Sequence, residues 1–147
     1  QGNRFANAIA QAGVETSLDD LQKMVAFLTP LKRLSTTFRF EAGSVRLDAQ
    51  SRINVQQLAI ALESGLYDAR RLVFVGFSDS EGSAEVNLRI SQRRADAVRQ
   101  AVVDAAETDE LSRVALEAEA FGEAMPMACD ETSWGRHVNR RVEIWVR

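Results

Sequence analysis

Two hydrophobic periodicities alternate along the chain and predict its elements. Apolar residues three or four positions apart predict amphipathic helices at 4–14, 18–28, 48–63 and 84–106. Apolar stretches that alternate with polar residues, or run on without a break, predict strands at 35–40, 71–77, 115–121 and 141–146. The predicted order is two short helices, followed by strand, helix, strand, helix, strand and strand.

Capping and helix-breaking residues fit these boundaries. Ser17 is suited to the N-cap of the second helix, and Thr29-Pro30 ends that helix because the residue before a proline avoids the helical region. Gly65 follows the third helix at a C-cap position. In the longest helix we expect four residues to face the core: Val86, Ile90, Val98 and Val102.

Helices that follow strands predict an α+β fold in which a mixed sheet carries helices on one face. A short helical segment precedes this unit. We therefore expect two parts: a helical N-terminal extension at 1–34, and a globular domain at 35–147. The leucine stripe of the extension, Leu18 to Leu28, could cover the domain, pack on a preceding region or pair with a second copy of the chain.

Composition narrows the range of functions. The 147 residues suit one domain with a full core, and the net charge of −3 argues against a general nucleic-acid binder. No apolar run approaches the length needed to cross a bilayer. A single Cys129 excludes an internal disulfide, and a single His137 excludes a histidine-rich metal site, so we expect no metal and no cofactor.

The stretch Gly76–Arg94 holds the strongest candidate chemistry. Asp79 lies in the polar turn after a predicted central strand, and Asn87, Ser91 and Arg94 share one face of the following helix. A fixed carboxylate and a fixed guanidinium can together bind a group that carries both an ammonium and a carboxylate. The alternative is that Asp79 and Arg94 form a structural salt bridge between turn and helix.

Several motifs occur together in the order of a known family. They are a Phe-x-x-Gly-Ser segment after the first strand, Gly-x-Ser-Asp after the second, Asn87, Ile90-Ser91-x-x-Arg94-Ala95, Val98, a Gly-Glu turn after the third strand, and Gly135-Arg136-x-x-Asn139-Arg140-Arg141-Val142-Glu143-Ile144. This set resembles the OmpA-like peptidoglycan-binding domain of outer-membrane proteins, peptidoglycan-associated lipoproteins and flagellar stator subunits. The resemblance covers about residues 36–147, and it depends on the ordered set, because no single motif is specific.

The resemblance implies non-catalytic, non-covalent binding to the stem peptide of peptidoglycan. Asp79 would meet the ammonium of the stem's meso-diaminopimelate residue, and Arg94 would meet its carboxylate. Asn87 and the Asn139-Arg140 pair would line or support the pocket. The turn at Glu41-Ala42-Gly43 would offer backbone contacts.

Two positions depart from the family pattern. Phe77 stands where the family usually has His or Tyr, which would remove a polar neighbour of the site. Ser78 replaces the usual Thr, which is a mild change. Both departures bear on affinity and on the ligand variant rather than on the type of function.

The resemblance further implies a periplasmic location at the cell wall of a Gram-negative envelope, within a longer or membrane-anchored protein. Two rival functions stay open. The chain could be a structural or oligomerisation module, including a homodimer. It could also be an enzyme built on Cys129, His137 and Asp130, although their spacing matches no known nucleophile motif.

Overall fold

The computed structural model describes residues 18–41, 44–79, 82–106, 113–122, 135–136 and 139–147. Its elements, in chain order, are α2 (Leu18–Leu28), β1 (Lys32–Arg39), α3 (Ala49–Glu63), β2 (Arg71–Phe77), α4 (Ala84–Ala105), β3 (Ala115–Gly122) and β4 (Arg141–Val146). The predicted α+β order is confirmed. The predicted helix at 4–14 lies outside the described residues.

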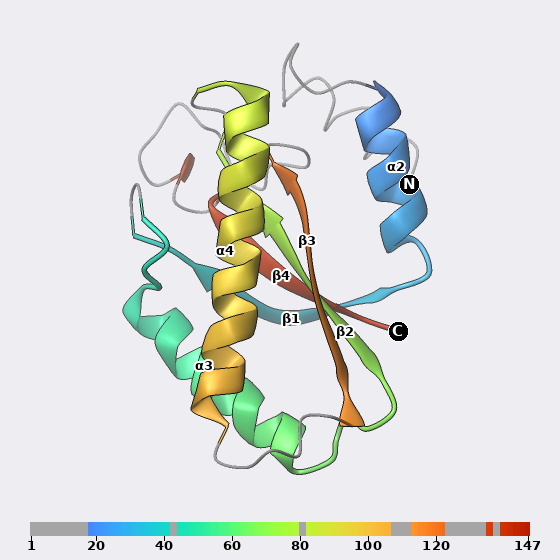
Figure 1. Ribbon diagram of the computed structural model, residues 1–147, viewed down its shortest axis with the longest axis vertical. Coiled ribbons are helices and arrows are strands. Elements are labelled where there is room, and N and C mark those ends of the chain that lie inside the picture. Colours follow the sequence, from blue (N-terminus) through green and yellow to red (C-terminus); the bar gives the residue numbers. More distant parts are fainter. Residues whose placement is uncertain (1–17, 42–43, 80–81, 107–112, 123–134, 137–138) are drawn as a thin grey trace.

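The four strands form one mixed sheet in the order β1-β4-β2-β3. Strands β2 and β3 are parallel, while β4 is antiparallel to both β1 and β2. The carboxyl ends of β1, β2 and β3 therefore meet the start of β4 at one end of the sheet. The N-terminal end of α4 lies at this same end (Figure 1). Every predicted site residue within the described part of the chain belongs to this end.

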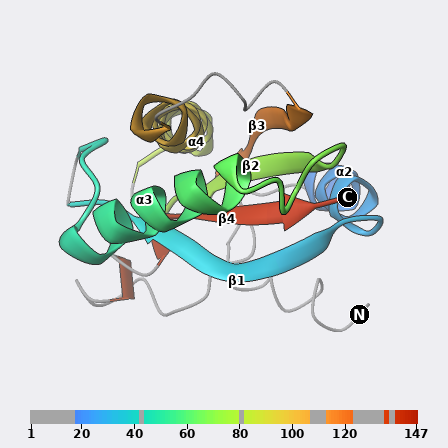
Figure 2. The ribbon, with the colours of Figure 1, turned by 90° about the horizontal axis from the view of Figure 1, so that it is seen from below.

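The main hydrophobic core lies between the sheet and the pair α3 and α4, which lie side by side on one face (Figure 2). Leu72 and Phe74 of β2 point into it, together with Val98 and Val102 of α4. Each helix begins with a side-chain cap, because Asp48 accepts a hydrogen bond from the Ser51 amide and Ser83 accepts one from Val86. These caps fix where α3 and α4 start.

Helix α2 covers the opposite face of the sheet. Since side chains alternate along a strand, Val73, Val75 and Phe77 of β2 point away from the main core. They are buried instead against Met24 and Leu28 of α2, and Leu31 completes the cluster. The described part of the predicted leucine stripe thus packs on its own sheet, which makes Leu28 unavailable for pairing with a second copy.

Some details of the sequence-based expectation are wrong. Strand β1 begins at Lys32, three residues before the predicted start. Val86 was expected in the core but is 41% exposed. The reason in α4 is that its first turns bury the polar stripe Asn87, Ser91 and Arg94, which turns Val86 outward. None of the described helices is both long enough and apolar enough to cross a bilayer.

Gly76 sets the distance between α4 and β2. A Cβ atom at this position would lie 2.8 Å from the carbonyl carbon of Ser91 and would clash with its carbonyl oxygen. Both are backbone atoms of α4, so a side chain at Gly76 could be accommodated only by moving the helix. The absence of a side chain here allows the N-terminal half of α4 to lie directly against the strand.

Ser91 ties the same part of α4 to the end of β3. Its hydroxyl donates to the Leu88 carbonyl at 2.8 Å and accepts from the Gly122 amide at 3.1 Å. The Gly122 carbonyl in turn accepts from the Ser78 amide at 2.6 Å. Gly122 has a φ of +58°, a conformation that favours glycine. Helix α4 and the ends of β2 and β3 are therefore connected immediately beside Asp79.

Replacing Gly76 with alanine tests this close approach. We expect Gly76→Ala to lower the free energy of unfolding by about 1–3 kcal/mol or more, since the new methyl group forces the backbone of α4 outward. Urea denaturation would measure the loss, and amide chemical shifts at Ser91 and Arg94 would report the helix displacement. An unchanged urea midpoint with unchanged shifts would contradict the proposed contact.

Replacing Met24 with alanine tests the docking of α2. Met24 is fully buried, so we expect Met24→Ala to cost about 2–5 kcal/mol of unfolding free energy through lost burial and a cavity. Gln22→Ala, on the exposed side of the same helix, is the matched control and should change stability by less than about 0.5 kcal/mol. Equal effects of the two variants would mean that α2 does not pack on the sheet in solution.

Candidate functional site

Arg94 is the most unusual group at this end of the sheet. It lies on the buried stripe of α4 and is only 4% exposed. Its Nε donates to the Ser44 carbonyl at 3.2 Å, and its guanidinium carbon lies 5.4 Å from the centre of the Phe40 ring. Among the residues that the structure describes, no carboxylate forms an ion pair with it. Arg94 is thus a buried cation held by a carbonyl and an aromatic face.

The surroundings of Arg94 disfavour its charge. Burial lowers the pKa of the Arg94 guanidinium, and the nearby positive charge of Arg140 lowers it further. The negative charge of Asp79 acts in the opposite direction. An added carboxylate at Arg94 would relieve this imbalance, because it would pair with a guanidinium that burial has already separated from water.

Asp79 is also buried, with 8% of its surface exposed. Its Oδ2 accepts from Arg140 Nη1 at 2.9 Å, and each of the two side chains is 11% exposed. No ion pair joins Asp79 to Arg94 within the described residues. The alternative that these two residues form a structural salt bridge is therefore wrong. The arginine that pairs with Asp79 is Arg140, which precedes β4, and not Arg94 of α4.

The segment before β4 brings further predicted residues to the site. The Arg140 amide donates to the Arg136 carbonyl at 3.0 Å, which forms a turn just before the strand. Asn139 in this turn is fully buried, and Asn87 on the first turn of α4 is 3% exposed. Both asparagines therefore belong to the interior of this end of the molecule.

The turn after β1 reaches the site through its backbone. The Ser44 amide donates to the Glu41 carbonyl at 3.2 Å, and the Ser44 carbonyl accepts from Arg94. The Glu41 carboxylate pairs with Arg46 at 3.4 Å and both side chains are exposed. Ala42 and Gly43 lie outside the described residues. Ser44 and Phe40, which contact Arg94 directly, were not singled out from the sequence as site residues.

Phe77 does not line the site, contrary to the expectation. It is 1% exposed and packs in the cluster under α2, because its side chain points to that face of the strand. The Arg141 guanidinium carbon lies 4.1 Å from the centre of the Phe77 ring. Arg141 also donates to Glu143 at 2.8 Å. Phe77 therefore supports a buried Arg141–Glu143 pair on the far face of the sheet.

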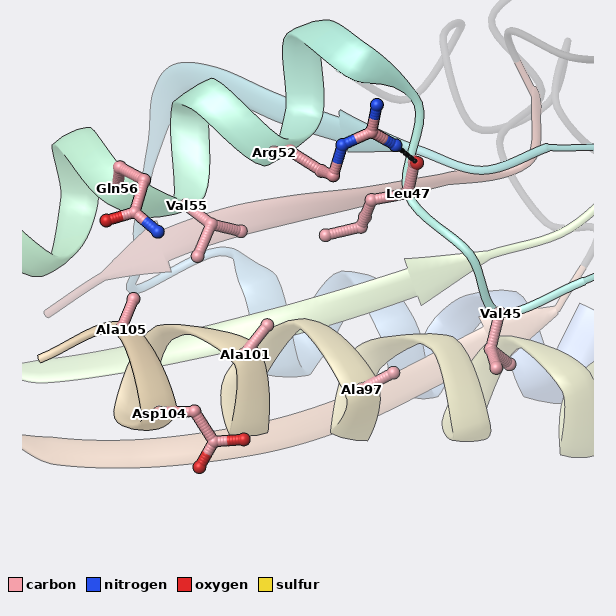
Figure 3. Close-up of a pocket in the computed structure, with 9 residues that line it drawn as sticks. All are labelled: Val45, Leu47, Arg52, Val55, Gln56, Ala97, Ala101, Asp104 and Ala105. Carbon is pink, nitrogen blue, oxygen red and sulfur yellow. Dashed lines mark hydrogen bonds between the residues drawn. The ribbon is translucent and has the colours of Figure 1, made fainter.

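A separate hollow lies between α3 and α4 (Figure 3). It has a volume of about 480 Å³, and its lining does not include Asp79 or Arg94. Among the described residues, no group of three or more His, Cys, Asp or Glu side chains is placed to hold a metal ion. Cys129, Asp130 and His137 lie outside the described residues, so the structure does not test the enzyme hypothesis built on them.

Taken together, Arg94, Arg140 and Asp79 place two guanidiniums and one carboxylate within a single buried cluster at the end of the sheet. The cluster has an excess of one positive charge among these three side chains. Arg94 is suited to receive a carboxylate, and Asp79 stands next to it as an acceptor for a cationic group. This arrangement can bind a small charged ligand in a defined orientation.

Comparison with known proteins agrees with this architecture. Residues 39–140 match the OmpA family. The chain is 40% identical over 113 residues to outer membrane porin F of Pseudomonas fluorescens, covering 77% of this chain and 32% of the porin. It is 30% identical over 105 residues to the probable lipoprotein YiaD of Escherichia coli (strain K12), covering 71% of this chain and 45% of that protein. The chain thus spans less than half the length of these two relatives.

A solved structure shares the fold. The peptidoglycan-associated lipoprotein from Burkholderia pseudomallei superimposes with a TM-score of 0.64 and 28% sequence identity, covering 76% of this chain and 89% of that one. The family match runs from the last residue of β1 to the residue before β4, and it includes Asp79, Arg94 and Arg140. The chain belongs to the OmpA family.

Proposed function

We propose that this chain binds the stem peptide of peptidoglycan through the free end of its diaminopimelate residue, without cleaving it, and so attaches an envelope protein to the cell wall. The observation that carries the proposal is Arg94, a guanidinium 4% exposed that pairs with no carboxylate among the described residues. The ligand carboxylate would supply the missing counter-charge.

The ligand chemistry suits both charges of the site. The free end of diaminopimelate carries an ammonium and a carboxylate on one carbon atom. Arg94 can donate two parallel hydrogen bonds to the carboxylate. A guanidinium has five N–H donors, and only the Nε–H of Arg94 donates to the Ser44 carbonyl. The ammonium would then approach Asp79, whose carboxylate already accepts from Arg140.

Arg140 has a supporting part in this proposal. A carboxylate that is 8% exposed is costly to keep charged without a partner. Arg140 provides that partner at 2.9 Å and fixes one oxygen of Asp79. Asn87 and Asn139, both buried beside these residues, would hold the walls of the pocket in place.

The hydroxyl groups beside the site favour binding over catalysis. Ser91 Oγ is engaged with the Leu88 carbonyl and the Gly122 amide, and Ser78 Oγ donates to the Asp79 carbonyl at 2.9 Å. Neither has a histidine or carboxylate base as its hydrogen-bond partner in these contacts. Both hydroxyls therefore serve the local structure rather than acting as nucleophiles.

The relatives support a role at the cell wall. One protein of the same fold, at 28% identity, is named a peptidoglycan-associated lipoprotein, and another relative is an outer membrane porin. We infer a periplasmic location for this domain, within a longer or membrane-anchored envelope protein. A homodimer stays a prediction, which sedimentation of the intact chain would test.

Substitutions at the two charged residues test the proposal. In calorimetric or NMR titrations with meso-diaminopimelate, we expect Arg94→Gln and Asp79→Asn each to weaken binding by roughly 10- to 100-fold, because each removes a charge-assisted hydrogen bond of about 1.5–3 kcal/mol. Circular dichroism would confirm that both variants remain folded.

Two matched controls are available on α4. Arg93→Gln and Asp96→Asn make the same chemical changes at exposed positions of the helix, and each should leave the affinity within about twofold of the unaltered chain, as expected for surface positions. Failure of the intact chain to bind at millimolar ligand, or equal affinities for Arg94→Gln and Arg93→Gln, would contradict the proposed function.

A further inference from the structure

An open hollow lies on the surface between α3 and α4. Its volume is about 480 Å³, within the range of ligand pockets. Ala97, Ala101 and Ala105 line the α4 side at four-residue spacing, and Val55 and Leu47 lie opposite them (Figure 3). The small side chains of α4 leave this space open. We call this hollow the α3–α4 groove.

One end of the α3–α4 groove lies next to the candidate site in the chain. Val45 lines one end of the groove and is 45% exposed. It directly follows Ser44, whose carbonyl accepts from Arg94. On α4, Ala97 and Ala101 are three and seven residues beyond Arg94, which places them on the same side of the helix. The groove therefore begins one residue along the chain from a group that contacts Arg94.

The two ends of the groove carry side chains of opposite charge. Arg52 lies on the exposed rim near Leu47, and its Nη1 donates to the Leu47 carbonyl at 2.7 Å, which leaves its other N–H groups available (Figure 3). Asp104 lies at the far end, beside Ala105 (Figure 3). The end closest to Arg94 is therefore cationic. It suits a short apolar group that ends in a carboxylate.

We propose that the α3–α4 groove is a second subsite, which binds the D-alanine residue that follows diaminopimelate in a tetrapeptide stem. This inference rests on the proposed function, because the diamino acid must first be held at Arg94. The D-alanine methyl group lies against Ala97 and Ala101, on the apolar α4 side of the groove. The terminal carboxylate of the stem pairs with Arg52 at the rim.

Titration with peptides of two lengths tests the subsite. The probes are meso-diaminopimelate, the stem tripeptide that ends in it, and the tetrapeptide with one added D-alanine. We expect the tetrapeptide to bind at least about fourfold more tightly than the tripeptide, which is the gain from burying one methyl group. NMR titration would place the additional shifts at Ala97 and Ala101.

Variants of the groove separate it from the diamino acid site. Ala101→Leu fills the groove and should bring tetrapeptide affinity down to that of the tripeptide, without changing the affinity for meso-diaminopimelate. Ala26→Leu makes the same change at an exposed position of α2 and should retain the full gain. Arg52→Gln should lower the affinity for the tetrapeptide by up to about fivefold, as expected for the loss of one exposed ion pair. Thermal unfolding would confirm that each variant is folded.

The outcomes distinguish the two proposals. Equal binding of tripeptide and tetrapeptide, or a gain that survives in Ala101→Leu, would overturn the second subsite while leaving the diamino acid site intact. No binding of meso-diaminopimelate or of either peptide would overturn both. A length-dependent gain that is lost in Ala101→Leu and kept in Ala26→Leu would establish the subsite.

Discussion

The close approach of α4 to β2 at Gly76 is the constraint on which the site depends. Since a Cβ atom there would meet the backbone of Ser91, glycine lets the helix lie directly on the strand. Ser91 then uses its hydroxyl to hold the end of β3. These contacts place Arg94 one turn further along the helix and Asp79 just beyond the strand, so the two side chains reach the same end of the sheet.

The charges of the site are only partly balanced within the described residues. Arg140 neutralises Asp79, whereas Arg94 is held by the Ser44 carbonyl and the Phe40 ring. A carbonyl dipole and an aromatic face stabilise a buried cation less than a carboxylate does. The fold tolerates this because the rest of the domain is well packed, with α3 and α4 on one face of the sheet and α2 on the other. Binding free energy would come from completing the charge balance in a pre-formed site.

Local sequence signals predicted much of this structure. Apolar periodicity, together with the stop signals Thr29-Pro30 and Gly65, places strands and helices within a few residues of their observed ends. The stripe Asn87, Ser91 and Arg94 is buried along one helix face as its spacing indicates. The same stripe explains why the outward position of Val86 was missed, since an apolar residue was assumed to face the core.

The contacts that could not be predicted are those between distant segments. Arg140, which pairs with Asp79, is 61 residues away, so the sequence paired Asp79 with Arg94, which is nearer along the chain. Ser44 acts through its backbone carbonyl, which no side-chain pattern reveals. The face to which Phe77 points depends on strand register and on the docking of α2, and both are properties of the tertiary structure.

A crystal structure of the chain with meso-diaminopimelate would test the central claim most directly. The account predicts one ligand carboxylate within hydrogen-bonding distance of the Arg94 guanidinium, with the adjacent ammonium at Asp79 and Arg140 still in contact with that carboxylate. A ligand bound elsewhere, or a site that stays empty in crystals saturated with the ligand, would contradict it.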